Sequence, residues 1–270
     1  MSGRGALAAA FAAARREDRA AFVPFLMAGD PTLERTGELV GALAGAGADV
    51  IELGVPFSDP IADGPVNQAA AERALAAGTR LAGILELVSR IRRRVEAPIV
   101  LFSYFNPILR YGPARFAEHA SASGVDGLLC VDLPPEEAAA EVLPALRAQR
   151  LDPVFLLAPT STRERVRAVA RAGSGFVYYV SRTGVTGERA ALPAGLASEV
   201  RALRRALDLP VAVGFGLSTP EQVAAVARVA DGAVVGSALV RFAAEHAGEP
   251  DLLPLFARRA ARLAAATRRG

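Results

Sequence analysis

Two carboxyl groups in the stretch VIELGVPFSDPIADGP, residues 50–65, have the type and spacing needed for acid–base chemistry. Glu52 ends an apolar run, and Asp63 follows in a loop that also holds Asp59 and three prolines. A carboxyl group in apolar surroundings has a raised pKa and can exchange protons near neutrality, whereas a better hydrated one stays ionised. One buried acid is more often a satisfied structural group, but two that converge on one site favour general acid–base catalysis.

Composition argues against several other chemistries. All 31 basic residues are arginine, so no lysine can form a Schiff base with a carbonyl substrate or with pyridoxal phosphate. His119 and His246 have no metal-ligand spacing, so we expect no metal site. The net charge of +3 is spread along the chain without a basic, aromatic-rich run, which argues against nucleic-acid binding. Cys130 permits no internal disulfide and is expected to be a core residue in a reducing cytoplasm.

The elements that must position these groups alternate along the whole chain. Short apolar runs, each predicted to be a strand, are separated by amphipathic stretches rich in alanine and arginine. The predicted strands are residues 21–28, 49–53, 98–103, 127–131, 153–158, 176–180, 210–214 and 232–236. This alternation predicts a parallel sheet, and the first strand lacks the G-x-G-x-x-G of a dinucleotide-binding open sheet. We therefore predict a single (β/α)8 TIM barrel, with residues 1–270 forming one catalytic domain.

Two segments need separate interpretation. Residues 2–18 combine alanine, phenylalanine and arginine, and an extra N-terminal helix is a better interpretation than a signal peptide, because alanine is barely apolar enough for the core of a signal. No long, strongly apolar run follows, so nothing is expected to span or bind a membrane. Pro144 falls inside an otherwise helical stretch and should kink or split that helix.

Active sites of such barrels lie where the strands end at their carboxyl termini. Besides the acids, Asp30, Tyr104, Asn106, Asp132 and Tyr178 fall there. Glycine-rich turns after the last two predicted strands suit a phosphate, because backbone N–H groups can approach an anion at a helix start. Tight turns also use glycine for purely structural reasons. The long loop 181–195 is either a lid over the site or a surface insertion.

Four motifs carry a resemblance to a known family: ELGVPFSDPIADGP, YYVSRTGVTG, GFGLSTPEQV and GSALV. Together, and in this order, they resemble the α chain of tryptophan synthase, and the match runs from FVPFLMAGDP to GSALV. The resemblance implies a carbon–carbon lyase of tryptophan biosynthesis. Its reaction would be a retro-aldol cleavage of indole-3-glycerol phosphate to indole and glyceraldehyde 3-phosphate, without a cofactor.

The resemblance also implies roles for individual residues. Glu52 would be the acid–base group, Asp63 would accept the indole N–H and stabilise positive charge on the ring, and Tyr178 would line the same site. The phosphate would be bound by Gly187, Gly216, Gly236 and Ser237. The indole pocket would be walled by Phe25, Phe102, Leu129 and Phe215, each of which is equally plausible as a core residue.

Family members pair with a β chain that carries pyridoxal phosphate and receives indole through a tunnel. The resemblance thus implies a cytoplasmic α2β2 assembly, with the cofactor only in the β chain and with Asp59 and Thr186 in loops that communicate with it. Two alternatives stay open. The chain could act as a stand-alone lyase that releases indole, or as a non-catalytic effector subunit that binds phosphate. Retention of both Glu52 and Asp63 argues against the effector.

Overall fold

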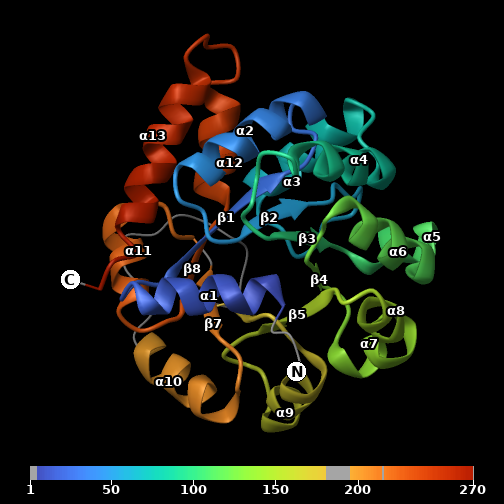
Figure 1. The fold of residues 1–270 in the computed structure, drawn as a ribbon, viewed down its shortest axis with the longest axis vertical. Helices are drawn as coiled ribbons and strands as arrows, with labels where there is room; N and C mark the ends of the chain where they lie inside the picture. The colour runs from blue at the N-terminus through green and yellow to red at the C-terminus, as the bar shows by residue number, and fades with distance from the viewer. Residues whose placement is uncertain (1–4, 181–194, 215, 270) are drawn as a thin grey trace.

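The computed structural model describes residues 5–180, 195–214 and 216–269, and its centre is a closed barrel of eight parallel strands (Figure 1). Each strand pairs with its neighbours in chain order, and β1 pairs with β8 to close the ring. The strands are β1 Ala21–Met27, β2 Ile51–Gly54, β3 Ile99–Ser103, β4 Gly127–Cys130, β5 Asp152–Leu157, β6 Val177–Val180, β7 Val211–Gly214 and β8 Gly232–Val235. All eight predicted strands are confirmed, with differences of at most two residues at their ends.

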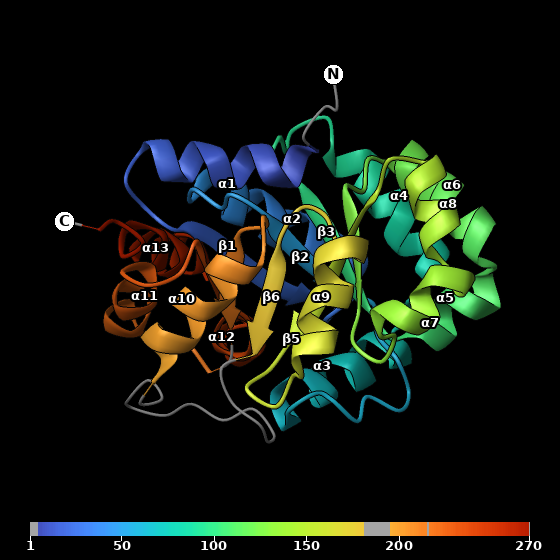
Figure 2. The same ribbon diagram turned by 90° about the horizontal axis from the view of Figure 1, so that it is seen from below.

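Helices surround this barrel (Figures 1 and 2). They are α1 Ala6–Arg16, α2 Leu33–Gly45, α3 Pro65–Ala76, α4 Leu81–Ile91, α5 Phe105–Tyr111, α6 Pro113–Ser123, α7 Pro135–Glu141, α8 Leu143–Ala148, α9 Arg163–Ala172, α10 Leu196–Ala206, α11 Pro220–Ala227, α12 Ser237–Glu245 and α13 Leu252–Ala265. The predicted break at Pro144 is confirmed, because α7 and α8 meet at Val142 and the proline occupies the first turn of α8. No helix in the described ranges is long and apolar enough to cross a membrane.

The extra N-terminal helix α1 is confirmed, and it covers one end of the barrel (Figure 2). Its apolar face buries Leu7, Phe11 and Ala14, and the ring centroids of Phe11 and Phe176 lie 5.1 Å apart. The strands start at this end, as the arrow of β6 in Figure 2 shows. Side chains inside the barrel continue the same apolar cluster, so this end is closed to ligands.

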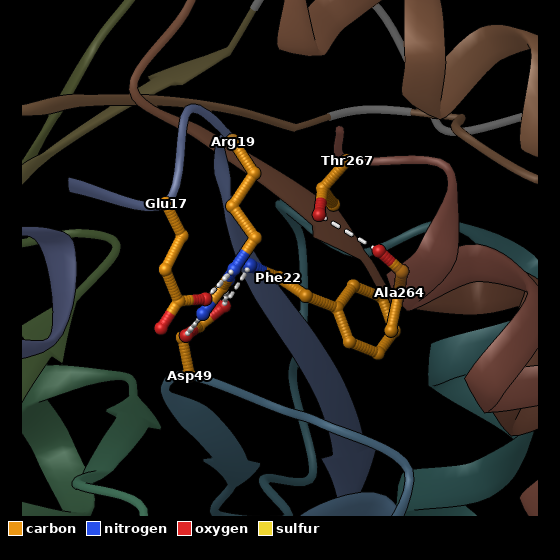
Figure 3. A network of polar contacts seen from close by, with 6 residues as sticks. All are labelled: Glu17, Arg19, Phe22, Asp49, Ala264 and Thr267. Atoms are coloured by element: carbon orange, nitrogen blue, oxygen red, sulfur yellow. Dashed lines mark hydrogen bonds and ion pairs between the residues drawn. The ribbon is translucent and has the colours of Figure 1, made fainter. Parts of the chain in front are cut away.

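Carboxylates at the starting ends of three strands are paired with arginines. Asp49 receives two bonds from the guanidinium of Arg19, at 2.5 and 2.8 Å, and a third from the backbone N–H of Phe22 at 2.7 Å (Figure 3). Each carboxylate here precedes one strand and accepts an N–H from the strand before it, so the pairs tie neighbouring strands together.

The same arrangement recurs twice further along the chain. Asp126 accepts from the Ile99 N–H at 2.8 Å and pairs with Arg92. Asp231 accepts from the Val211 N–H at 3.0 Å, and its second oxygen lies 3.1 Å from Arg204. The starting end of the barrel is therefore fastened by charge-assisted hydrogen bonds.

Candidate active site

A pocket of about 620 Å³ opens at the opposite end of the barrel, where the strands finish. Strand residues and the loops that follow them form its wall together. The lining residues are Phe25, Glu52, Ile61, Ala62, Asp63, Asn67, Phe102, Val131, Leu156, Leu157, Ala158, Ser161, Arg165, Tyr178, Val180, Gly216, Val234, Gly236 and Ser237. The structure therefore brings together both predicted acids, the predicted tyrosine and two of the four predicted wall residues, Phe25 and Phe102.

Glu52 is the most deeply buried acid in this pocket. It sits on β2 between Phe25 of β1 and Val100 of β3, and only 1% of its surface is exposed. Neither carboxyl oxygen has a hydrogen-bond partner among the described residues. Burial without compensation raises the pKa of Glu52 to about 8. The group is therefore largely protonated at neutral pH and able both to donate and to accept a proton.

Asp63 is also buried, but it is hydrogen-bonded. The Tyr104 hydroxyl donates to its Oδ2 at 3.1 Å and itself accepts from the Ala62 N–H at 2.9 Å. Burial raises the pKa of Asp63, while the side chains of Tyr104 and Asn67 oppose that rise by favouring the charged form. The two acids therefore differ in their surroundings. The carboxyl group of Glu52 is buried away from water and has no hydrogen-bond partner among the described residues, whereas the carboxyl group of Asp63 accepts hydrogen bonds from neighbouring side chains.

Three aromatic rings line the pocket near the acids. Phe102 packs edge-on against Phe25 at 5.4 Å and against Tyr178 at 6.4 Å between ring centroids. Burial and the nearby charges of Glu52 and Asp63 raise the pKa of Tyr178 far above its ordinary value, so its phenol stays protonated. These rings offer flat, apolar surface that suits an aromatic substrate.

Glycines make room for this wall. A Cβ atom at Gly54 would lie 2.6 Å from Cζ of Phe25, and one at Gly214 would overlap the Tyr178 ring. Both glycines are the last residues of their strands, β2 and β7. Only a residue without a side chain lets these two rings turn into the pocket.

The other predicted groups have mixed placements. Gly216, Gly236 and Ser237 line the pocket; Gly216 has φ of +76°, and Ser237 begins α12 after Gly236. The free N–H groups of this helix start suit an anion. Leu129 lies inside the barrel core with no exposed surface and does not line the pocket. Asp59 is exposed in the loop after β2. Gly187, Thr186 and Phe215 lie outside the described residues.

Several residues in or beside the pocket were not predicted as site residues. Tyr104 was noted only as following a strand, although it holds Asp63, and Asn67 lies in the first turn of α3 after the acidic loop. Ser161 and Arg165 come from the start of α9, where the sequence resembles any capped helix. Among the described residues, no group of three histidine, cysteine or acidic side chains could hold a metal ion.

The closed barrel with an acid-lined, aromatic pocket at the finishing ends of its strands is the architecture of a (β/α)8-barrel enzyme that acts on a small molecule. Comparisons with known proteins narrow this class. Residues 11–258 match the family model described as "Tryptophan synthase alpha chain". Curated proteins of that name from Citrifermentans bemidjiense and Geobacter sulfurreducens are each 57% identical; the alignments cover 88% and 87% of this chain, and 89% of each relative.

Solved structures agree with these relatives. A chain of Mycobacterium tuberculosis tryptophan synthase superposes with a TM-score of 0.91 at 39% identity, covering 99% of this chain and 100% of that one. Tryptophan synthase subunit alpha from Legionella pneumophila gives a TM-score of 0.91 at 36% identity, covering 98% and 99%. The chain belongs to the tryptophan synthase α chain family. It is a lyase that cleaves indole-3-glycerol phosphate in tryptophan biosynthesis.

Proposed function

We propose that Glu52 is the acid–base group of the cleavage. Its buried, unpartnered carboxyl is the observation that carries the proposal. In its protonated form Glu52 donates a proton to C3 of the indole ring, leaving a positive charge that is shared with the ring nitrogen. The carboxylate formed then takes the proton of the glycerol hydroxyl, the carbonyl of glyceraldehyde 3-phosphate forms, and the C–C bond breaks. Its electron pair restores the indole ring, and Glu52 ends protonated as it began.

Asp63 and Tyr178 complete the proposed acid end of the site. Asp63 accepts the indole N–H and, as a carboxylate, stabilises the positive charge on the ring. The hydrogen bond from Tyr104 keeps that carboxylate in place. Tyr178, held as a neutral phenol, packs against the substrate together with Phe25 and Phe102, whose rings it adjoins. This arrangement supplies proton transfer at one point and charge stabilisation at another.

The phosphate end is proposed at Gly216, Gly236 and Ser237. These residues are supported by their positions in the loops after β7 and β8 and by the helix start at Ser237. By the family resemblance, Gly187 belongs to the same group. An anchored phosphate fixes the distance from C3 of the indole to Glu52, so that the reacting atoms meet in one orientation.

We further propose that residues 1–270 act as one catalytic domain in the cytoplasm, without a cofactor of their own, beside a β chain carrying pyridoxal phosphate in an α2β2 assembly. Ile61 supports a partner surface, because it is 81% exposed in the same loop as exposed Asp59. The solved structures that this chain resembles are those of tryptophan synthase and of its subunit alpha.

The test is indole release from indole-3-glycerol phosphate by the purified chain, with and without a matched β chain. We expect release by the native chain, acceleration by the β chain, and loss of release in Glu52→Gln. Glu86→Gln, which changes an exposed glutamate on α4, is the matched control and should behave as native. Full release by Glu52→Gln would refute its acid–base role. Release that the β chain does not change would favour the stand-alone lyase.

A further inference from the structure

A second pocket, of about 570 Å³, lies on the outside of the barrel among α11, α12 and α13. Figure 1 shows these three helices side by side at one edge of the molecule. The residues that line it are Ser218, Thr219, Pro220, Glu221, Phe242, Leu255, Arg258, Arg259, Arg262 and Leu263. None of them lines the active-site pocket. We refer to this set as the α13 pocket.

The α13 pocket is positively charged. Three arginines of α13 line it: Arg258 and Arg259, which are adjacent in the sequence, and Arg262, about one turn further on. The lining contains one carboxylate, Glu221. No side-chain hydrogen bond or ion pair joins these arginines to a carboxylate within the described parts of the chain. The hydrogen bond with the Thr219 side chain is the main cause that lowers the pKa of Glu221, and the charge of Arg262 adds a smaller effect in the same direction. Three guanidinium groups against one carboxylate leave a cationic site.

Arg259 is the least hydrated of the three. Its Nε is buried and has no hydrogen-bond partner among the described residues. Its guanidinium carbon lies 5.1 Å from the centroid of the Phe242 ring, which holds the group over an aromatic face. A buried donor without an acceptor costs free energy. An anion bound in the pocket would supply that acceptor.

The rest of the wall is apolar. Phe242, Leu255, Leu263 and Pro220 provide carbon surface, and Phe242 is held by stacking on His246 at 4.0 Å between ring centroids. A free phosphate or chloride ion would leave this surface in contact with water. A flat apolar body attached to the anion would cover it.

The start of α11 forms part of the pocket wall, but it does not supply the groups that would bind an anion. The Thr219 side chain accepts from the Gln222 N–H, while Gln222 Oε1 accepts from the N–H groups of Ser218 and Thr219. Pro220, the first helical residue, has no N–H. Most donors of this helix start are already used, so the arginines of α13 must hold the anion.

We propose that the α13 pocket binds an organic anion, an aryl carboxylate, with its carboxylate on Arg259 and Arg262 and its ring against Phe242 and Leu255. The planar guanidinium fork matches a carboxylate with two parallel hydrogen bonds. The site is separate from the proposed catalytic pocket but shares two segments with it. Helix α12 runs from Ser237 in the catalytic pocket to Phe242, and Ser218 follows shortly after Gly216.

The test uses 1-naphthoate as the probe and 1-naphthamide, of the same shape without charge, as the control ligand. Each is titrated into the isotopically labelled chain while backbone amide signals are followed by NMR. We expect saturable shifts at Thr219, Phe242 and Leu255 with naphthoate, and affinity for the amide at least about tenfold weaker. Shifts confined to Phe102 and Val131 would place the ligand in the catalytic pocket and overturn the proposal. So would equal affinity for the two ligands.

Variants of the pocket arginines test whether their charges are needed for naphthoate binding. Replacing both Arg259 and Arg262 by methionine should weaken naphthoate binding at least about tenfold, since the charge-assisted bonds are lost. Arg90→Met, which changes an exposed arginine on α4, should leave it unchanged. If the double variant fails to fold, Arg259→Lys serves instead, because it keeps the charge but loses the fork and should weaken binding. Native affinity in the double variant, or in Arg259→Lys where the double variant does not fold, would overturn the proposal.

Discussion

Asp49 and Glu52, at the two ends of the barrel, have opposite surroundings. Where the strands start, Asp49 receives three hydrogen bonds, two of them from Arg19. Where the strands finish, Glu52 has 1% exposure and no partner among the described residues. A paired carboxylate stays charged and ties strands together, whereas an unpaired one destabilises the fold in its ionised form. The Asp49 pair therefore contributes stability, whereas the surroundings of Glu52 favour its protonated form.

The largest expected effect is on catalysis at the finishing end. Glu52→Gln should lower kcat for indole release by roughly 100- to 10,000-fold, the usual contribution of general acid–base catalysis. Substrate affinity should change little, since the amide occupies nearly the same space. Steady-state kinetics together with calorimetric binding of the substrate would check both. A proportionate loss of affinity would make Glu52 a binding group instead.

At the starting end, the expected effect is on stability. Asp49→Asn removes the charge that Arg19 and the Phe22 N–H contact, and should lower the free energy of unfolding by about 3 kcal/mol. Urea denaturation measures the change, with Asp208→Asn, an exposed acid, as control. Activity per folded molecule should stay native. A change below about 0.5 kcal/mol would contradict the role of this pair.

The pH dependence of stability should also separate the ends. The folded-state pKa of Glu52, about 8, exceeds its ordinary value of 4.5. Between these values the folded chain holds the extra proton, so this group lowers the free energy of unfolding as pH rises. Glu52→Gln should therefore gain stability relative to the native chain on going from about pH 5 to about pH 9. Parallel curves for the two proteins would show that Glu52 titrates normally.

The smallest expected effect concerns Tyr104. Tyr104→Phe removes the hydroxyl that donates to Asp63 and should reduce kcat about tenfold, or ~1.4 kcal/mol, the lower range for a bond to a charged group. Because that bond favours the charged form, the pKa of Asp63 should rise, and the acid limb of the pH–rate profile should move to higher pH. Phe57→Leu, which alters a ring packed 5.2 Å from the Tyr104 ring, is the steric control. An unmoved acid limb would exclude the positioning role.

The features that could be predicted from the sequence are those encoded by short local patterns of residues. The apolar runs predict the eight strands, and the placement of Glu52 and Asp63 after one run predicts their convergence. Long-range partners were not predictable. Any of 31 identical cations could have paired with Asp49, and nothing local distinguishes Arg19. The bond from Tyr104 to Asp63 depends on how one loop folds over another strand. The sequence likewise left Leu129 open as a wall or a core residue, because it does not give the depth of a side chain inside the barrel.

One contact at the starting end bears on how the chain folds. The Ala20 N–H donates to the Thr267 carbonyl at 3.0 Å, and the Arg269 N–H to the Asp18 carbonyl at 3.1 Å. The segment leading into the first strand is thus fastened by the last described residues, and the first strand also pairs with β8. These partners lie far apart in the sequence, so the outer edge of β1 stays unpaired until β8 has folded. Closing the ring therefore depends on contacts of high sequence separation, which are the slow ones to form.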